Sequence, residues 1–87
     1  MGSIIVTITN KEKGFYQDIE VPVQVNIQKL KDDIIDCLNA YTSSFDFPKH
    51  GVKIFHDRNQ CFIEDTNTLE EAGVWNGDYI SLIYERK

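Results

Sequence analysis

Arginine, cysteine and long hydrophobic runs are all scarce in this sequence of 87 residues. Its two arginines, Arg58 and Arg86, lie far apart, and its formal net charge is −5. Proteins that bind phosphate groups draw on clustered lysine and arginine side chains. The charge balance therefore argues against nucleic acid, and against an anionic membrane surface, as the main partner of this chain.

The sequence also lacks the apolar segments that direct a chain into a membrane. No run approaches the roughly 20 apolar residues of a spanning helix, and the start has no cationic region followed by an apolar stretch. We therefore expect no direct insertion into a bilayer. The two cysteines, Cys37 and Cys61, are too few for the disulfide framework of a small secreted domain. We expect both to be buried, reduced thiols in a cytoplasmic protein.

The length suits one domain that spans residues 1–87. At this size roughly 60–65% of the surface of the unfolded chain becomes buried, which allows one modest core. A deep active-site cleft between domains is therefore not expected.

The stretch from Val21 to Leu38 is the segment that reads most clearly as a helix. An apolar residue recurs in it at helical spacing, at Ile27, Leu30, Ile34 and Leu38. Asn26 precedes the first of these positions and is well suited to cap a helix N-terminus. A helix with one apolar stripe needs a partner that covers the stripe, and the rest of the chain predicts short strands.

Two segments before the helix and three after it have the β-branched and alternating composition of strands. They are Ile4–Thr9, Phe15–Val21, Val52–His56, Cys61–Ile63 and Tyr79–Tyr84. The long loop before the third strand contains Phe45 and Phe47, which we expect to anchor it. Thr68 and Glu71 have the spacing of a capping box and predict a short helical turn. Asn76-Gly77 predicts a turn before the last strand.

This order of elements predicts an α+β fold. The first and last strands are the most apolar, so we expect both at the centre of the sheet, paired parallel to each other. The predicted architecture is a β-grasp, or ubiquitin-like, roll: a mixed four- to five-stranded sheet with one helix packed across it. Another two-layer α+β sandwich is the alternative.

Two groups of residues resemble the YukD/EsaB family of small bacterial ubiquitin-like proteins. The first is Asp18-Ile-Glu-Val-Pro22 running into Asn26-Ile-Gln-Lys-Leu30. The second is Leu69 followed by Ala72-Gly73-Val74, and then Asn76-Gly77-Asp78 before the last strand. The resemblance covers nearly the whole chain. It differs at the serine- and phenylalanine-containing loop after the helix and at the charged C-terminal end.

The resemblance implies a cytoplasmic accessory or regulatory protein of a type VII (WXG100, ESX-like) secretion system. Such a protein works by protein–protein interaction, without catalysis or cofactor, and its implied partner is a component of the secretion machinery. A related domain resembles the cytosolic end of a membrane component of these systems. The resemblance is therefore compatible with a free protein and with a domain of a larger chain.

The predicted ubiquitin-like fold also allows a different function. The chain would then be a modifier or a sulfur-carrier-type protein that is activated at its C-terminus. Activation of such proteins needs an unhindered Gly-Gly end, whereas this sequence ends Tyr84-Glu-Arg-Lys87. We therefore expect the chain to act without being conjugated.

The candidate chemical groups do not form a recognisable catalytic or metal motif. His50, His56, Asp57 and Cys61 have no common zinc spacing. Nucleophilic catalysis would need His56 to activate Cys61 or Cys37, with a third group behind it. His56 and Cys61 are expected to be near neighbours across a turn, but no residue pattern supplies an oxyanion hole. We expect neither an enzyme nor a metal site.

An apolar group on the outer face of the sheet is the candidate protein-binding site. Strand alternation places Phe55 and Ile83 on the face opposite the helix, near Ile5 and beside Lys53. Exposed, clustered apolar residues on a small domain mark an interface. The alternative is that a loop, the C-terminal tail or a second copy in a homodimer covers them.

Three further aromatic residues are candidates for extending this protein-binding site. Tyr79 and Tyr84 would extend the candidate site along the last strand. Trp75 either extends it or seals a corner of the core, because it stands beside the predicted turn.

Overall fold

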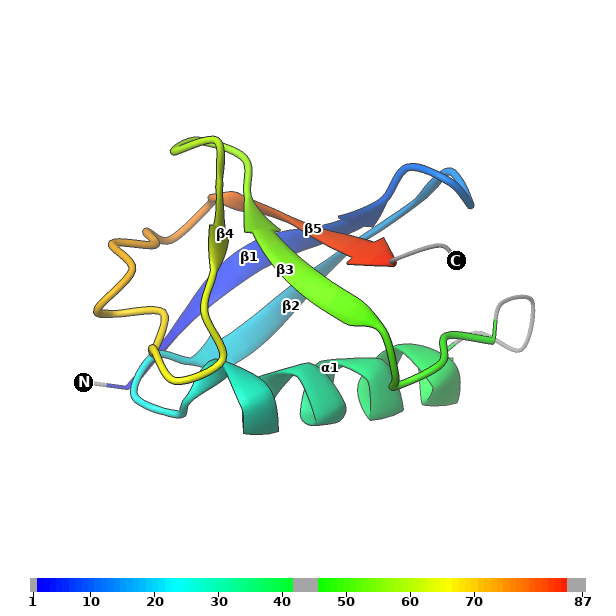
Figure 1. Ribbon diagram of the computed structural model, residues 1–87, viewed down its shortest axis with the longest axis horizontal. Helices are drawn as coiled ribbons and strands as arrows, with labels where there is room; N and C mark the ends of the chain where they lie inside the picture. Colours follow the sequence, from blue (N-terminus) through cyan, green and yellow to red (C-terminus); the bar gives the residue numbers. More distant parts are fainter. Residues whose placement is uncertain (1, 42–45, 85–87) are drawn as a thin grey trace.

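The structure is a computed structural model that describes residues 2–41 and 46–84. A hairpin of β1 (Ser3–Asn10) and β2 (Phe15–Pro22) comes first, followed by α1 (Ile27–Tyr41). The chain continues with β3 (Val52–His56), β4 (Cys61–Ile63) and β5 (Tyr79–Tyr84). Figure 1 shows α1 lying across one face of the sheet that these strands form.

The five strands form one mixed sheet in the order β2-β1-β5-β3-β4. β1 and β5 pair parallel, with Ile8 opposite Ile80, and the other neighbours pair antiparallel. The two most apolar strands therefore lie side by side at the centre of the sheet, as predicted, because each buries its inner face under the helix. This arrangement of one helix and a five-stranded sheet is the ubiquitin-like β-grasp fold.

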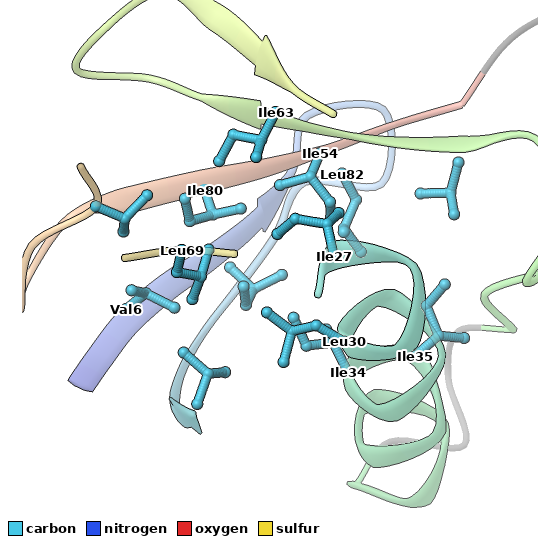
Figure 2. Packing of buried hydrophobic residues seen from close by; sticks show 14 of the residues in the cluster. Val6, Ile27, Leu30, Ile34, Ile35, Ile54, Ile63, Leu69, Ile80 and Leu82 are labelled. Atoms are coloured by element: carbon cyan, nitrogen blue, oxygen red, sulfur yellow. The ribbon is translucent and has the colours of Figure 1, made fainter. Parts of the chain in front are cut away.

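The helix begins where the sequence predicts. The side-chain Oδ1 of Asn26 accepts a hydrogen bond from the backbone N–H of Lys29 over 3.1 Å, which satisfies one orphan donor of the first turn. The carbonyl of Asn26 accepts from the N–H of Leu30 over 3.0 Å. Figure 2 shows the helix residues Ile27, Leu30 and Ile34 directed toward the strands.

The core is the space between α1 and the inner face of the sheet. Ile8 and Ile80 from the central strands and Ile35 and Leu38 from the helix are almost fully buried in it. Phe47 is also buried and packs edge to face against Phe15, with ring centroids 5.2 Å apart. The prediction of a loop anchor is therefore confirmed at this residue. Phe45, the other predicted anchor, lies outside the described residues.

The segment between β4 and β5 is fixed by the predicted capping box. The Thr68 hydroxyl accepts from the N–H of Glu71 over 3.1 Å, and the Glu71 carboxylate accepts from the N–H of Thr68 over 2.9 Å. The result is a series of turns with buried Leu69 and Val74 rather than a regular helix. The N–H of Ile27 also donates to the carbonyl of Asn67 over 2.8 Å, which ties this segment to the start of α1.

Candidate protein-binding site

The outer face of the sheet is the face that α1 leaves uncovered (Figure 1). Alternation along β3 buries Val52 and Ile54 and turns Lys53 and Phe55 outward. Ile83 in β5 also faces outward, directly opposite Lys53. The predicted orientation of these three side chains is confirmed.

Lys53, Phe55, Phe62 and Ile83 form a cluster at the β3–β4 end of this face, which we call the aromatic patch. Phe55 and Phe62 are cross-strand partners and pack edge to face, with ring centroids 5.1 Å apart. The ammonium of Lys53 lies 5.7 Å from the centroid of the Phe62 ring. Phe62 is 51% exposed, whereas Phe55 is half-buried beneath it.

Ile5 is exposed on the same face but does not belong to the aromatic patch. β1 and β5 are parallel, and Thr7 stands opposite Tyr79. Ile5 precedes Thr7 by two positions and Ile83 follows Tyr79 by four, so their levels differ by about 20 Å along the strands. The expectation that Ile5 lies near Ile83 was wrong, because the register of the parallel pair displaces the two residues in opposite directions.

Phe62 is the patch residue that sequence reasoning did not identify. Its signal is the alternation within β4, because Ile63 is buried and its neighbour must face the other way. A strand of three residues offers too little sequence to fix that orientation without the register against β3.

Trp75 lies beneath an arginine on the surface and does not seal the core. It is 64% exposed, and the guanidinium carbon of Arg58 stands 3.9 Å from the centroid of its ring. Arg58 also donates to the carbonyl of Gly73 over 2.6 Å and to both carboxylate oxygens of Asp78 over 3.2 Å. The Asn76-Gly77 turn is thus held on the outside by one side chain.

Behind the contact between Arg58 and Trp75, Asp78 also binds the buried His56. The imidazole of His56 is fully buried, and its Nε2 lies 2.8 Å from Oδ2 of Asp78. Burial by itself raises the pKa of the Asp78 carboxyl. Hydrogen bonds from the Trp75 N–H, from Arg58 and from His56, together with the positive charge of Arg58, outweigh burial and lower that pKa from 3.8 to about 2. Asp78 is therefore a permanently charged structural group at neutral pH.

The two thiols differ from each other in exposure. Both cysteines are free, as expected, but Cys61 is exposed and Cys37 is only partly buried. The expectation that both are buried was wrong because Cys61 begins β4, an edge strand that is paired on one side only.

His56 and Cys61 are cross-strand partners, which confirms that they are neighbours. The Nε2 of His56 is bonded to Asp78, however, and its Nδ1 has no hydrogen-bond partner. The histidine is therefore oriented toward the turn before β5 and holds neither thiol by a hydrogen bond.

The described parts of the chain, 2–41 and 46–84, contain no group of three His, Cys, Asp or Glu residues placed to hold a metal ion. Within the same residues no helix has the length and apolar character needed to cross a membrane.

The fold and the outer face together define a ubiquitin-like domain, and two solved structures show how close the likeness is. The ubiquitin of Caldiarchaeum subterraneum superposes with a TM-score of 0.73 at 20% identity, covering 99% of this chain and 98% of that one. The ubiquitin-like domain of the Mycobacterium tuberculosis type VII secretion system protein EccD1 superposes with a TM-score of 0.74 at 18% identity, covering 95% and 99%.

Sequence comparison gives the family. Residues 3–82 match the family described as WXG100 protein secretion system (Wss), protein YukD. The chain therefore belongs to the YukD family. No curated protein is similar enough in sequence to add a relative to this assignment.

Proposed function

We propose that this chain is a non-catalytic accessory protein of a WXG100 secretion system, and that it acts in the cytoplasm as one folded domain without being conjugated. It recognises a protein component of the machinery through the aromatic patch. Membership of the YukD family supports the link to secretion. The patch supports binding as the mode of action.

The observation that carries the proposal is the exposure of Phe62. Half of this large apolar side chain stays in water although Phe55 orders it from one side. Burying such a ring against a partner is favourable by about 25 cal/mol for each Å² removed from water. An ordered, half-exposed aromatic pair loses little conformational freedom on binding, which is a property of interface hot spots.

Lys53 gives the patch a charged rim. Its ammonium lies over the Phe62 ring and opposite Ile83, in a protein whose overall charge is negative. A partner surface with an apolar centre and an acidic edge complements this arrangement. The helix lies across the opposite face of the sheet (Figure 1).

A secretion assay tests the role in the machinery. The gene is deleted in the host, and the release of WXG100 proteins into the medium is measured after complementation with the wild type or with Phe62→Asp. We expect the wild type to restore release and the variant to fail at an equal intracellular level. Normal release from the deletion strain, or full complementation by the variant, would contradict the proposal.

A further inference from the structure

A second feature of the outer face lies beyond the aromatic patch, toward the β1–β2 hairpin. It is a shallow depression of about 580 Å³, lined by Thr9, Tyr16, Asp57 and Tyr79, with Lys11 at its rim. Tyr16 and Tyr79 are 75% and 55% exposed, so two solvent-exposed phenol side chains line the depression.

The strand register explains why the surface is hollowed there. Thr9 stands opposite Tyr16 on one side and opposite Ser81 on the other, and Ser81 in turn stands opposite Phe55. Two small hydroxyl residues on the central strands thus lie in one row between aromatic residues on β2 and β3. Of this row, Thr9 and Tyr16 line the depression, and Tyr79, opposite Thr7, lines it from β5.

Asp57 brings a negative charge to the depression. The hydroxyl of Ser81 donates to its Oδ1 over 2.7 Å, and the hydroxyl of Thr9 lies 3.0 Å from that of Ser81. Because Ser81 gives its only proton to the carboxylate, Thr9 is the donor in the second contact. The carboxylate is partly buried and held in place by this two-hydroxyl chain.

Asp57 has no ion-pair partner among the described residues, in contrast to four other aspartates. Asp33, Asp36, Asp65 and Asp78 each form an ion pair with a lysine or arginine. Among the described residues, Asp57 forms none, and Lys11 at the rim makes no ion pair with it. A partly buried carboxylate is more stable with an opposite charge at hydrogen-bonding distance.

We infer that this depression receives a lysine or arginine side chain of the protein that covers the aromatic patch. A cation between two phenol rings gains cation–π attraction, and the remaining oxygen of Asp57 accepts its hydrogen bond. Asp57 follows Phe55 by two positions, about 7 Å along the chain, and Tyr79 lies on β5, the strand next to β3, so one extended partner segment spans the patch and the depression. The inference rests on the proposed binding function and adds a basic residue to the chemistry of the partner.

The first test uses probes in place of the unidentified partner. The ¹⁵N-labelled protein is titrated with Nα-acetyl-arginine amide and Nα-acetyl-lysine amide, and with the uncharged Nα-acetyl-citrulline amide as control. We expect saturable shifts of the amides of Thr9, Tyr16, Asp57, Tyr79 and Ser81 with the charged probes only. Equal shifts with citrulline, or shifts centred elsewhere on the surface, would overturn the inference.

Variants at Asp57 test its role in the inferred cation site. Asp57→Asn keeps the oxygen that accepts from Ser81 but removes the charge, so the fold is retained and the affinity for the charged probes falls by about fivefold. Asp18→Asn, on the same face, leaves the affinity unchanged. An undiminished affinity in Asp57→Asn would overturn the assignment.

Phe62→Asp separates this inference from the proposed function. It removes the aromatic patch but not the depression, so it should bind the charged probes as the wild type does. Probe binding by a protein that captures no secretion component would remove the proposed function and leave the cation site standing. Capture of the component by Asp57→Asn at wild-type affinity would overturn the inference and leave the proposed function intact.

Discussion

His56 and Asp78 are joined by a contact of 2.8 Å between the buried imidazole Nε2 and a carboxylate oxygen. This contact links the end of β3 to the turn before β5, because Asp78 follows Gly77 directly. Asp78 also accepts from the N–H of Trp75 over 2.9 Å and from Arg58. A single carboxylate thus holds both sides of the turn.

The pH dependence of folding should report this carboxylate. Its pKa is lowered to about 2, so its contribution to stability is complete above the unfolded pKa near 4 and is lost as the pH falls toward 2. We expect Asp78→Asn to lower the free energy of unfolding at pH 7 by about 1–2 kcal/mol, discounted because Arg58 is exposed to solvent. Urea unfolding followed by circular dichroism at pH 7 and at pH 2.5 measures it.

Asp33→Asn is the matched control for that experiment. Asp33 forms only a surface pair with Lys29, and its removal should cost less than about 0.5 kcal/mol. The difference between the two variants should shrink at the lower pH, where Asp78 approaches its pKa. Equal destabilisation by the two substitutions at pH 7 would show that Asp78 has no special role.

Truncation of Phe47 should be the more damaging of two phenylalanine-to-alanine changes. Phe47 is buried, and its backbone N–H and C=O both bond to the side-chain amide of Asn39, over 2.9 and 3.0 Å. We expect Phe47→Ala to cost about 3–5 kcal/mol, as for a buried aromatic residue. Phe62→Ala, at a half-exposed position, should cost less than about 1.5 kcal/mol. Chemical denaturation of both variants measures this, and a reversed order would contradict the placement of the two rings.

Alkylation should distinguish the two thiols. Cys61 is exposed and Cys37 is partly buried beside the helix stripe. In the native protein we expect iodoacetamide to modify Cys61 at least about tenfold faster than Cys37, with equal rates in denaturant. Peptide mass spectrometry after timed pulses measures both rates. Protection of Cys61 in the native state would contradict its position at the start of β4.

Local patterns were enough to predict most of the fold. Helical spacing from Ile27 to Leu38, the cap at Asn26 and the turn at Asn76-Gly77 each depend on neighbours in the sequence, and each appears in the structure. The parallel pairing of β1 with β5 was predicted from their apolar composition, because central strands of a covered sheet are the most buried.

The candidate site was harder to predict because it depends on register and on edges. Alternation predicts the face of Ile5 and Ile83, but only the β1–β5 register shows that they lie far apart. Cys61 stands beside the apolar residues Phe62 and Ile63, which favours burial. Its exposure follows from the position of β4 at the edge of the sheet. The contact between Arg58 and Trp75 joins two loops, and no local pattern predicts it.

Capture of the partner tests the central claim most directly. Tagged wild type, Phe62→Asp and Tyr41→Asp, all shown to be folded by circular dichroism, are incubated with the solubilised membrane fraction of the host. Tyr41 is a matched control because it is an exposed aromatic residue at the end of α1, away from the patch. We predict that the wild type and Tyr41→Asp retain the same WXG100 secretion component and that Phe62→Asp loses it. Retention of that component by Phe62→Asp would show that the aromatic patch is not the binding site.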